Sequence, residues 1–297
     1  MIIPAEERAI MTLNSETITI RGRKIAARTG GDPAKPAILL LHGFPSSSRM
    51  FRHVMNELSS VSYAIAPDLP GFGASDVLDK PTFAGFADTM EDLLDQLGIE
   101  SFYLYLHDYG AAVGLHLATR VPERIRGLII QNANAHRSGM DAQWADTERF
   151  WREPNPERER AATAHLTFEG TRDQYIGGIP GDIAEQMEEA CWQEDWQIMS
   201  RPGRIEYQRA LVFDYGQHVA RFDEIARYLE ERQPPALMIW GRHDIFFALD
   251  ETLSWMKALP RMEAHILDGA HFLLETHGDQ AAMLMKEFIR QTEDSRP

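Results

Sequence analysis

The chain has 297 residues, of which 44% are hydrophobic and 25% are charged, so its length and composition suit one large α/β domain with room for an inserted subdomain. Its formal net charge of −15 disfavours a nucleic-acid partner, because phosphate binding requires a basic surface. Cys191 is the only cysteine, which excludes an intrachain disulfide and a cysteine-based zinc cluster.

The apolar pattern predicts neither a secretion signal nor membrane insertion. Residues 1–8 lack the basic segment and long apolar run that a secretory signal requires. No apolar run approaches the ~18 residues that span a membrane. We therefore expect a soluble, cytoplasmic protein.

The first part of the chain predicts an edge hairpin followed by buried strands. Residues 17–21 and 24–28 alternate apolar with polar side chains, which is typical of paired strands at a sheet edge. Residues 38–41 are continuously apolar, as expected of a buried parallel strand, and lead into a His-Gly-Phe-Pro loop at 42–45. Residues 63–67 form the next strand, before a loop rich in glycine and proline.

A strand, a sharp turn and a helix are predicted around Asp108. Before this strand, residues 82–97 have apolar side chains at the spacing of a helix. The apolar run that begins at Leu104 turns at Asp108 and continues as a helix to Arg120. A turn of this kind lifts the residue at its tip above the sheet, where many hydrolases carry a nucleophilic serine.

The second half of the chain interrupts the alternation of strands and helices. Residues 127–131 form another strand, and the β-α-β order implies a parallel sheet with right-handed crossovers. Residues 135–233 have helical periodicity and no convincing strand, so we interpret them as an inserted helical cap. Strands resume at 236–240 and 263–267, before a closing helix at 279–290. The expected domains are a core at 1–134, a cap at 135–233 and the rest of the core at 234–297.

Asp108 at the tip of the turn predicts a carboxylate nucleophile. A carboxylate can attack an sp3 carbon and leave an alkyl ester on the enzyme, whereas a serine forms acyl-enzymes. Epoxides and carbon–halogen bonds are therefore the expected electrophiles. The alternative is that Asp108 only caps the following helix, because Asp is a favoured N-cap residue.

Two later loops add the residues of a triad. Asp244 follows the strand at 236–240, and His271 follows the strand at 263–267. The order of nucleophile, acid and histidine is the one found in hydrolases of this type. Active sites of open parallel sheets lie beyond the carboxyl ends of the strands. We therefore predict that Asp108, Asp244 and His271 meet there.

Five motifs together resemble the α/β-hydrolase superfamily, specifically its aspartate-nucleophile branch of epoxide hydrolases and haloalkane dehalogenases. They are His-Gly-Phe-Pro at 42–45, Asp-Leu-Pro-Gly-Phe-Gly at 68–73, His-Asp-Tyr-Gly at 107–110, Gly-Arg-His-Asp at 241–244 and Gly-Ala-His-Phe at 269–272. The resemblance covers nearly the whole chain. It implies an α/β-hydrolase fold with a mostly parallel eight-stranded sheet, flanking helices and an inserted helical cap.

The resemblance also implies a role for each site residue. Asp108 attacks carbon, and His271, oriented by Asp244, activates the water that hydrolyses the resulting ester. The backbone N–H groups of Phe44 and Tyr109 are implied to form the oxyanion hole. Three other histidines are expected to pack or hydrogen-bond around the site: His42, His107 and His243.

The leaving group separates the two activities of this branch. An epoxide oxygen needs a proton donor, which two cap tyrosines supply in epoxide hydrolases, whereas a halide needs only N–H donors. Haloalkane dehalogenases typically have Trp directly after the nucleophile and often Asn at the position of Phe44, where this chain has Tyr109 and Phe44. Fluoroacetate-type enzymes present an arginine where Tyr109 lies. We therefore expect an epoxide hydrolase, with a haloalkane dehalogenase as the alternative.

The cap contains candidate donors for either leaving group. Tyr215 lies late in the cap, at the place of the family's second catalytic tyrosine, and Tyr175 lies where the first is expected. Gly216 and Gln217 replace the Arg and Asn that follow the family's second tyrosine, and ordinary packing would also explain both tyrosines. Four cap tryptophans offer an indole N–H to a halide: Trp144, Trp151, Trp192 and Trp196.

Other functions are disfavoured by the motifs. A non-catalytic hydrolase-fold binding protein should show gaps in the triad or oxyanion loop, and this chain shows none. A serine esterase would need a different nucleophile at the elbow. No phosphate or dinucleotide fingerprint and no ligand-spaced cluster is present, so we expect no cofactor and no metal. Cap aromatics such as Phe150, Phe168, Trp192 and Phe213 favour a neutral, lipophilic small-molecule substrate.

Overall fold

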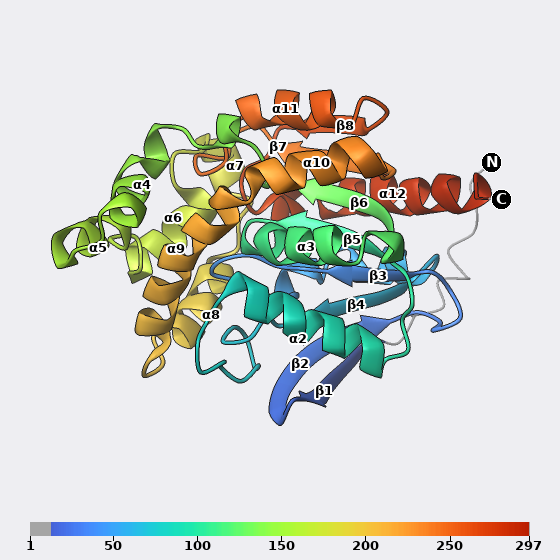
Figure 1. Cartoon of the computed structure of the whole chain (residues 1–297), viewed down its shortest axis with the longest axis horizontal. Helices are drawn as coiled ribbons and strands as arrows, with labels where there is room; N and C mark the ends of the chain where they lie inside the picture. The colour runs from blue at the N-terminus through green and yellow to red at the C-terminus, as the bar shows by residue number, and fades with distance from the viewer. Residues whose placement is uncertain (1–12, 297) are drawn as a thin grey trace.

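The computed structural model describes residues 13–296, which contain an eight-stranded sheet with helices on both faces (Figure 1). The strands are β1(Asn14–Ile20), β2(Arg23–Gly30), β3(Ala37–Leu40), β4(Tyr63–Pro67), β5(Phe102–His107), β6(Ile125–Gln131), β7(Ala236–Gly241) and β8(Glu263–Leu267). Their order across the sheet is β1-β2-β4-β3-β5-β6-β7-β8. β5, which leads to Asp108, therefore lies in the interior of the sheet.

The sheet is mostly parallel. β1 pairs with β2 and β2 pairs with β4 in antiparallel register, and the remaining neighbours pair in parallel. This arrangement confirms the predicted fold class. Parallel strands end at the same edge of a sheet, so the loops that follow β3, β5, β7 and β8 lie on one side of the molecule.

Burial on both faces explains the continuous apolar sequences of the central strands. In β3, Ile38 and Leu40 pack in one core cluster, and Leu39 packs in the other. Helices α1(Met55–Ser59) and α12(Leu273–Asp294) contribute to the cluster of Ile38, and α2(Phe83–Gln96) and α3(Tyr109–Arg120) contribute to that of Leu39. Each face of the sheet is thus covered by its own helices.

The chain between β6 and β7 is helical and contains no strand within this fully described stretch. Its α-helices are α4(Ala145–Arg152), α5(Pro156–Ala162), α6(Phe168–Ile176), α7(Gly181–Ala184), α8(Glu189–Met199), α9(Arg204–Ala220) and α10(Phe222–Arg232). Figure 1 shows α4 to α9 gathered beyond one end of the sheet, whereas α10 contacts α3 and α11(Asp250–Ala258). The division into a core and a cap at 135–233 stays a prediction.

The closing helix is longer than its sequence pattern predicts. α12 begins at Leu273 rather than at residue 279. His277, with φ of −123° and ψ of 25°, is not helical. The helix is therefore kinked there, and the residues before the kink do not share the apolar spacing from which the helix at 279–290 was predicted. Between residues 13 and 296, no helix has the length and apolarity needed to cross a membrane. The expectation for residues 1–8 concerns a segment outside the described residues.

Candidate active site

Asp108 lies at a sharp turn between β5 and α3. Its backbone has φ of 47° and ψ of −123°, a strained conformation that non-glycine residues seldom adopt. The loop after β3 approaches it closely, because a Cβ on Gly43 would lie 2.3 Å from Asp108 Oδ1. Asp108 occupies the N-cap position of α3, yet its side chain makes no capping hydrogen bond. Helix capping therefore does not explain this residue.

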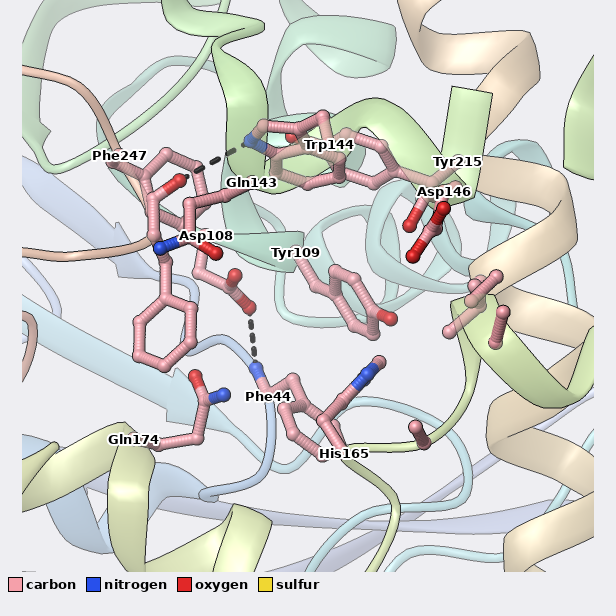
Figure 2. A pocket seen from close by; sticks show the side chains of 16 residues that line it. Phe44, Asp108, Tyr109, Gln143, Trp144, Asp146, His165, Gln174, Tyr215 and Phe247 are labelled. Carbon is pink, nitrogen blue, oxygen red and sulfur yellow. Dashed lines mark hydrogen bonds between the residues drawn. The ribbon is translucent and has the colours of Figure 1, made fainter. Parts of the chain in front are cut away.

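Two backbone N–H groups hold the Asp108 carboxylate. The N–H of Phe44 donates to Asp108 Oδ1 at 2.5 Å, the dashed line that joins these two residues in Figure 2, and the N–H of Tyr109 acts to lower the pKa of the carboxylate. Burial raises the pKa of Asp108 above its ordinary value, while the charge of His271 and these two N–H groups act to lower it. Both N–H groups that the sequence assigns to the oxyanion hole therefore act on the Asp108 carboxylate.

His271 and Asp244 form a buried hydrogen-bonded pair. His271 Nδ1 lies 2.8 Å from Asp244 Oδ2, and Asp244 Oδ1 accepts hydrogen bonds from the backbone N–H groups of Phe246 and Phe247. The side chain of His271 is only 2% exposed. Its Nε2 is buried and makes no hydrogen bond to any described residue. The structure thus brings Asp244 to His271.

The charges around His271 change its pKa. Burial alone would lower the pKa, but the charge and hydrogen bond of Asp244 and the charge of Asp108 raise it above the ordinary value. Protonated His271 cannot accept a proton from water. A base function of this residue is therefore lost as the pH falls through the raised pKa.

Turnover should consequently have an acid limb set by His271. We expect kcat to fall tenfold per pH unit below a pKa that lies above about 6.5, with alkyl-enzyme accumulating because hydrolysis of the ester is the step that needs neutral His271. Replacing Asp244 by asparagine removes one of the charges that raise the pKa, so the limb should move to lower pH. A kcat that is flat from about pH 8 to about pH 5 would contradict a base function for this histidine.

Three neighbours fix the position of His271. The side-chain amide of Gln131 donates to the His271 carbonyl at 3.0 Å. The ring of His107 lies 4.6 Å from the His271 ring, and the ring of Phe247 stacks on it at 5.3 Å and 12°. Burial holds the pKa of His107 well below its ordinary value, so His107 is neutral. The charges that raise the pKa of His271 are therefore those of Asp244 and Asp108.

The other two histidines of the motifs are held by loop contacts. His42 Nε2 accepts a hydrogen bond from the backbone N–H of Leu69 at 2.9 Å. His243 Nε2 lies 2.6 Å from the exposed carboxylate of Asp268. Both contacts join loops at the edge of the sheet, as expected of packing residues.

A cavity of about 280 Å³ opens above Asp108. Figure 2 shows Asp108, Tyr109, Trp144 and Tyr215 around it. Its aromatic lining is Phe44, Tyr109, Trp144, Tyr215, Phe246 and Phe247, and its polar lining is Asp108, Gln143, Asp146, Thr147, His165 and Gln174. None of its described lining residues is lysine or arginine. Within residues 13–296 no group of three or more His, Cys, Asp or Glu side chains is placed to hold a metal ion.

The structure separates the two candidate tyrosines of residues 135–233. Tyr215, on α9, lines the cavity and stacks on Trp144 at 4.9 Å and 16°. Tyr175, on α6, is fully buried and does not line the cavity. Its hydroxyl donates to Asp195 at 2.5 Å and accepts from Arg49 at 3.1 Å. Of these two tyrosines, only Tyr215 therefore lies where its side chain can reach a molecule above Asp108.

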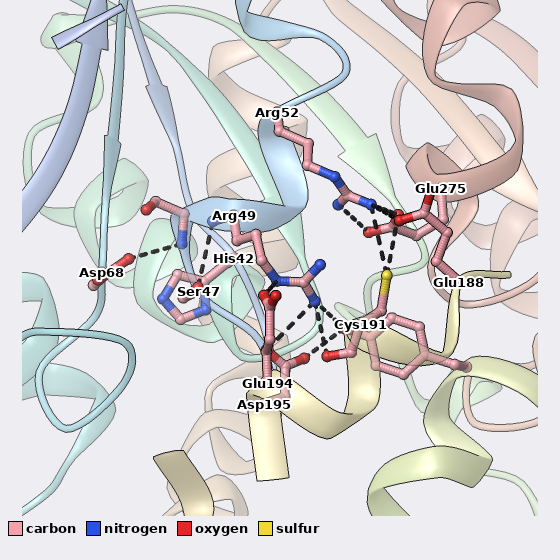
Figure 3. A network of polar contacts seen from close by, with 12 residues as sticks. His42, Ser47, Arg49, Arg52, Asp68, Glu188, Cys191, Glu194, Asp195 and Glu275 are labelled. Atoms are coloured by element: carbon pink, nitrogen blue, oxygen red, sulfur yellow. Dashed lines mark hydrogen bonds and ion pairs between the residues drawn. The ribbon is translucent and has the colours of Figure 1, made fainter. Parts of the chain in front are cut away.

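The hydroxyl of Tyr175 contacts two members of a polar network, Arg49 and Asp195. Figure 3 shows these two residues together with Cys191 and Glu275. Arg49, on the 3-10 helix η2(Ser48–Phe51), also donates to the carbonyl of Cys191 at 3.0 Å. Burial raises the pKa of Asp195 to about 6, against the lowering effect of Arg49 and Tyr175. This network anchors the helices over the cavity and takes no part in its lining.

Sequence reasoning missed several cavity residues. His165 lies in the turn before α6, and Gln174 precedes Tyr175 on that helix; both line the cavity. Burial lowers the pKa of His165 to about 4, although the carbonyl of Ala162 opposes this shift by accepting a hydrogen bond. No motif marks these positions, so only the packing of α6 reveals them.

The four candidate tryptophans of residues 135–233 offer no unused N–H to the cavity. Trp144 lines it, but its indole N–H donates to the carbonyl of Phe246 at 3.2 Å. The indole N–H of Trp151 donates to the carbonyl of Val212 at 2.8 Å. The remaining two, Trp192 and Trp196, do not line the cavity.

Comparison with known proteins identifies a family over most of the chain. The family model described as alpha/beta hydrolase fold matches residues 36–278. An uncharacterized hydrolase of Saccharomyces cerevisiae is 34% identical over 262 residues, which are 86% of this chain and 90% of that protein.

Proteins with named activities match less of the chain or at lower identity. A haloalkane dehalogenase of Bradyrhizobium diazoefficiens is 41% identical over 37% of this chain and 36% of its own length. Epoxide hydrolase 3 of Siraitia grosvenorii is 41% identical over 38% of this chain and 37% of its own length. The crystal structure of the haloalkane dehalogenase DbeA from Bradyrhizobium elkani matches with a TM-score of 0.77 and 23% identity, covering 96% of this chain and 100% of that chain.

Proposed function

Since this chain belongs to the α/β-hydrolase fold family, we propose that it is an epoxide hydrolase with Asp108 as its nucleophile. One observation carries the proposal: the cavity joins the carboxylate of Asp108 to the phenol of Tyr215. Epoxide opening needs both groups, a nucleophile for the carbon and an acid for the oxygen. The cofactor-independent reaction requires nothing else except water.

The proposed reaction has two steps. An Asp108 oxygen forms a bond to one epoxide carbon while the carbon–oxygen bond breaks, and the freed oxygen takes the proton of Tyr215. Water then attacks the carbonyl carbon of the ester, and His271 Nε2 accepts its proton. The N–H groups of Phe44 and Tyr109, already directed at the carboxylate, stabilise the negative oxygen that forms at this carbon. The bond between this carbon and the alkyl oxygen then breaks, the alkyl oxygen takes the proton held by His271, and the diol leaves. The proton of the resulting Asp108 carboxylic acid passes through water to the Tyr215 phenolate, so Asp108, Tyr215 and His271 return to their starting states.

The charges of the cavity favour a neutral substrate. Asp108 and Asp146 are acids in its lining, and no lysine or arginine is found among the lining residues that the structure describes. A substrate carboxylate would meet like charge without a cation to pair with it. The aromatic walls instead favour a neutral epoxide with an apolar or aromatic substituent.

A haloalkane dehalogenase using the same covalent route is the second candidate. It is favoured by the similarity to the Bradyrhizobium diazoefficiens protein, as the epoxide proposal is favoured by the similarity to the Siraitia grosvenorii protein. The indole N–H of Trp144 already donates to the carbonyl of Phe246. It is therefore not available to a halide, which weighs against dehalogenation. The third candidate, a non-catalytic binding protein, requires that Asp108 and His271 be inert.

A parallel screen discriminates these candidates. The purified protein is assayed against aryl and alkyl epoxides and matched bromoalkanes, with diol and bromide as the products measured. We expect diol without bromide. Bromide without diol would replace the proposal by dehalogenation, and binding of both substrate types without either product would support the binding protein.

Removal of the Tyr215 hydroxyl should slow epoxide opening. Tyr215→Phe keeps the ring that stacks on Trp144 but loses the acid, so we expect single-turnover alkylation to slow at least about 10-fold. Tyr228→Phe is the matched control, because the buried hydroxyl of Tyr228 lies outside the cavity and has no partner within the described part of the chain. Equal alkylation rates in the two variants would remove Tyr215 from the mechanism.

A further inference from the structure

A second phenol faces the cavity from the core of the protein. Tyr109 directly follows Asp108 and lines the same cavity as Tyr215, and Figure 2 shows its ring extending into the cavity. The two rings lie 5.9 Å apart between centroids. The hydroxyl of Tyr109 makes no hydrogen bond to any residue between 13 and 296, whereas that of Tyr175 is engaged by Asp195 and Arg49.

The ring of Tyr109 is held in place by its neighbours. It packs edge-on against Phe83 at 5.0 Å and 70°, and it lies 5.9 Å from the ring of Phe44. Burial and the charge of Asp108 raise the pKa of Tyr109 well above its ordinary value. The phenol is therefore both positioned and protonated at neutral pH, as a proton donor must be.

Four other polar side chains in the cavity are less suited to give a proton. Burial lowers the pKa of His165 to about 4, so its imidazole is neutral at neutral pH and is a poor acid. Gln143 and Gln174 can donate hydrogen bonds but cannot transfer a proton at neutral pH, and the same holds for the alcohol of Thr147. Tyr109 and Tyr215 are the phenols among the described lining residues.

We infer that Tyr109 acts together with Tyr215 as the pair of proton donors to the epoxide oxygen. This inference rests on the proposed function. As the bond from Asp108 to carbon forms, the electron pair of the breaking carbon–oxygen bond goes to the oxygen, which takes a proton from one phenol while the other donates a hydrogen bond. Solvent water reprotonates the phenolate. Tyr109 thus has two roles: its backbone N–H acts on the Asp108 carboxylate, and its phenol donates to the epoxide oxygen.

The test measures alkylation alone, in a full-length His271→Gln protein that cannot complete hydrolysis. Styrene oxide is mixed with this protein and with its Tyr109→Phe derivative, and the covalent adduct is counted by intact mass at successive times. We expect Tyr109→Phe to slow adduct formation about 10- to 100-fold. The ring contacts and the backbone N–H remain, and Tyr228→Phe in the same background should alkylate at the parental rate.

A second measurement separates acid function from packing. Incorporation of 3,5-difluorotyrosine at position 109 keeps the ring and hydroxyl but lowers the phenol pKa, so the alkaline fall in alkylation should move to lower pH than in the parent. A packing role would leave this pH profile unchanged.

The outcomes distinguish this inference from the proposed function. If the parent forms an adduct and Tyr109→Phe forms it at the same rate, or if the fluorinated protein keeps the parental profile, the inference is overturned while the epoxide hydrolase stands. If the parent forms no adduct with epoxides but does so with bromoalkanes, the proposed function fails and the inference fails with it.

Discussion

Replacement of Asp108 by alanine should abolish turnover, with kcat reduced at least about 10⁴-fold. The expected loss is large because no other carboxylate in residues 13–296 takes its position: Asp146 lies elsewhere in the cavity lining, and Asp244 is directed to His271 and to backbone N–H groups. Diol formation from styrene oxide, measured at saturating substrate, checks the prediction.

The matched control for this variant is Asp268→Ala, which removes an exposed carboxylate from a neighbouring loop that contacts Arg242 and His243. It should retain turnover within about a factor of three, because an exposed ion pair contributes little to stability. Thermal unfolding of both variants confirms that they are folded. Substantial activity in folded Asp108→Ala would show that another group attacks the substrate.

The replacement His271→Gln should stop the reaction after the first step. An ionised Asp108 needs no base to attack carbon, whereas water needs His271 to attack the ester. We therefore expect the enzyme to accumulate a covalent adduct with the mass of one substrate molecule, and steady-state turnover to fall about 10²- to 10⁴-fold. The adduct should map to the peptide that contains Asp108.

The control for this variant is Asp108→Ala combined with His271→Gln, which retains the cavity but lacks the nucleophile. It should remain unmodified under the same conditions. An unmodified single variant, incubated with a substrate that the parent protein turns over, would mean that the ester does not form or that another base hydrolyses it.

The central strands and the elbow could be predicted from sequence because their constraints are local. A strand buried on both faces must be apolar throughout, so 38–41, 127–131 and 236–240 are recognisable. The tight approach between Gly43 and Asp108 likewise requires specific residues at fixed positions. Residues that follow parallel strands are brought to one edge by the sheet itself, which is why Asp244 and His271 could be paired without a structure.

The lining of the cavity depends on packing that no local pattern encodes. Gln174 and Tyr175 are adjacent on α6, but only Gln174 faces the cavity, because the Tyr175 hydroxyl is held by Arg49 and Asp195 far away in the sequence. The second cavity phenol was expected from the inserted helices. It is instead Tyr109, directly after Asp108, a position that the sequence analysis considered for its backbone N–H and for its difference from the residues of related dehalogenases.

The formation of an ester on Asp108 is the central claim, and an oxygen-isotope experiment with the unmodified protein tests it most directly. A single turnover of excess enzyme with styrene oxide in H₂¹⁸O should give diol without ¹⁸O, because the new hydroxyl oxygen comes from the carboxylate. Repeated turnover should then place ¹⁸O in the peptide that contains Asp108. Diol that carries ¹⁸O after the first turnover, with no label in that peptide, would show that water attacks the epoxide directly and would contradict the account.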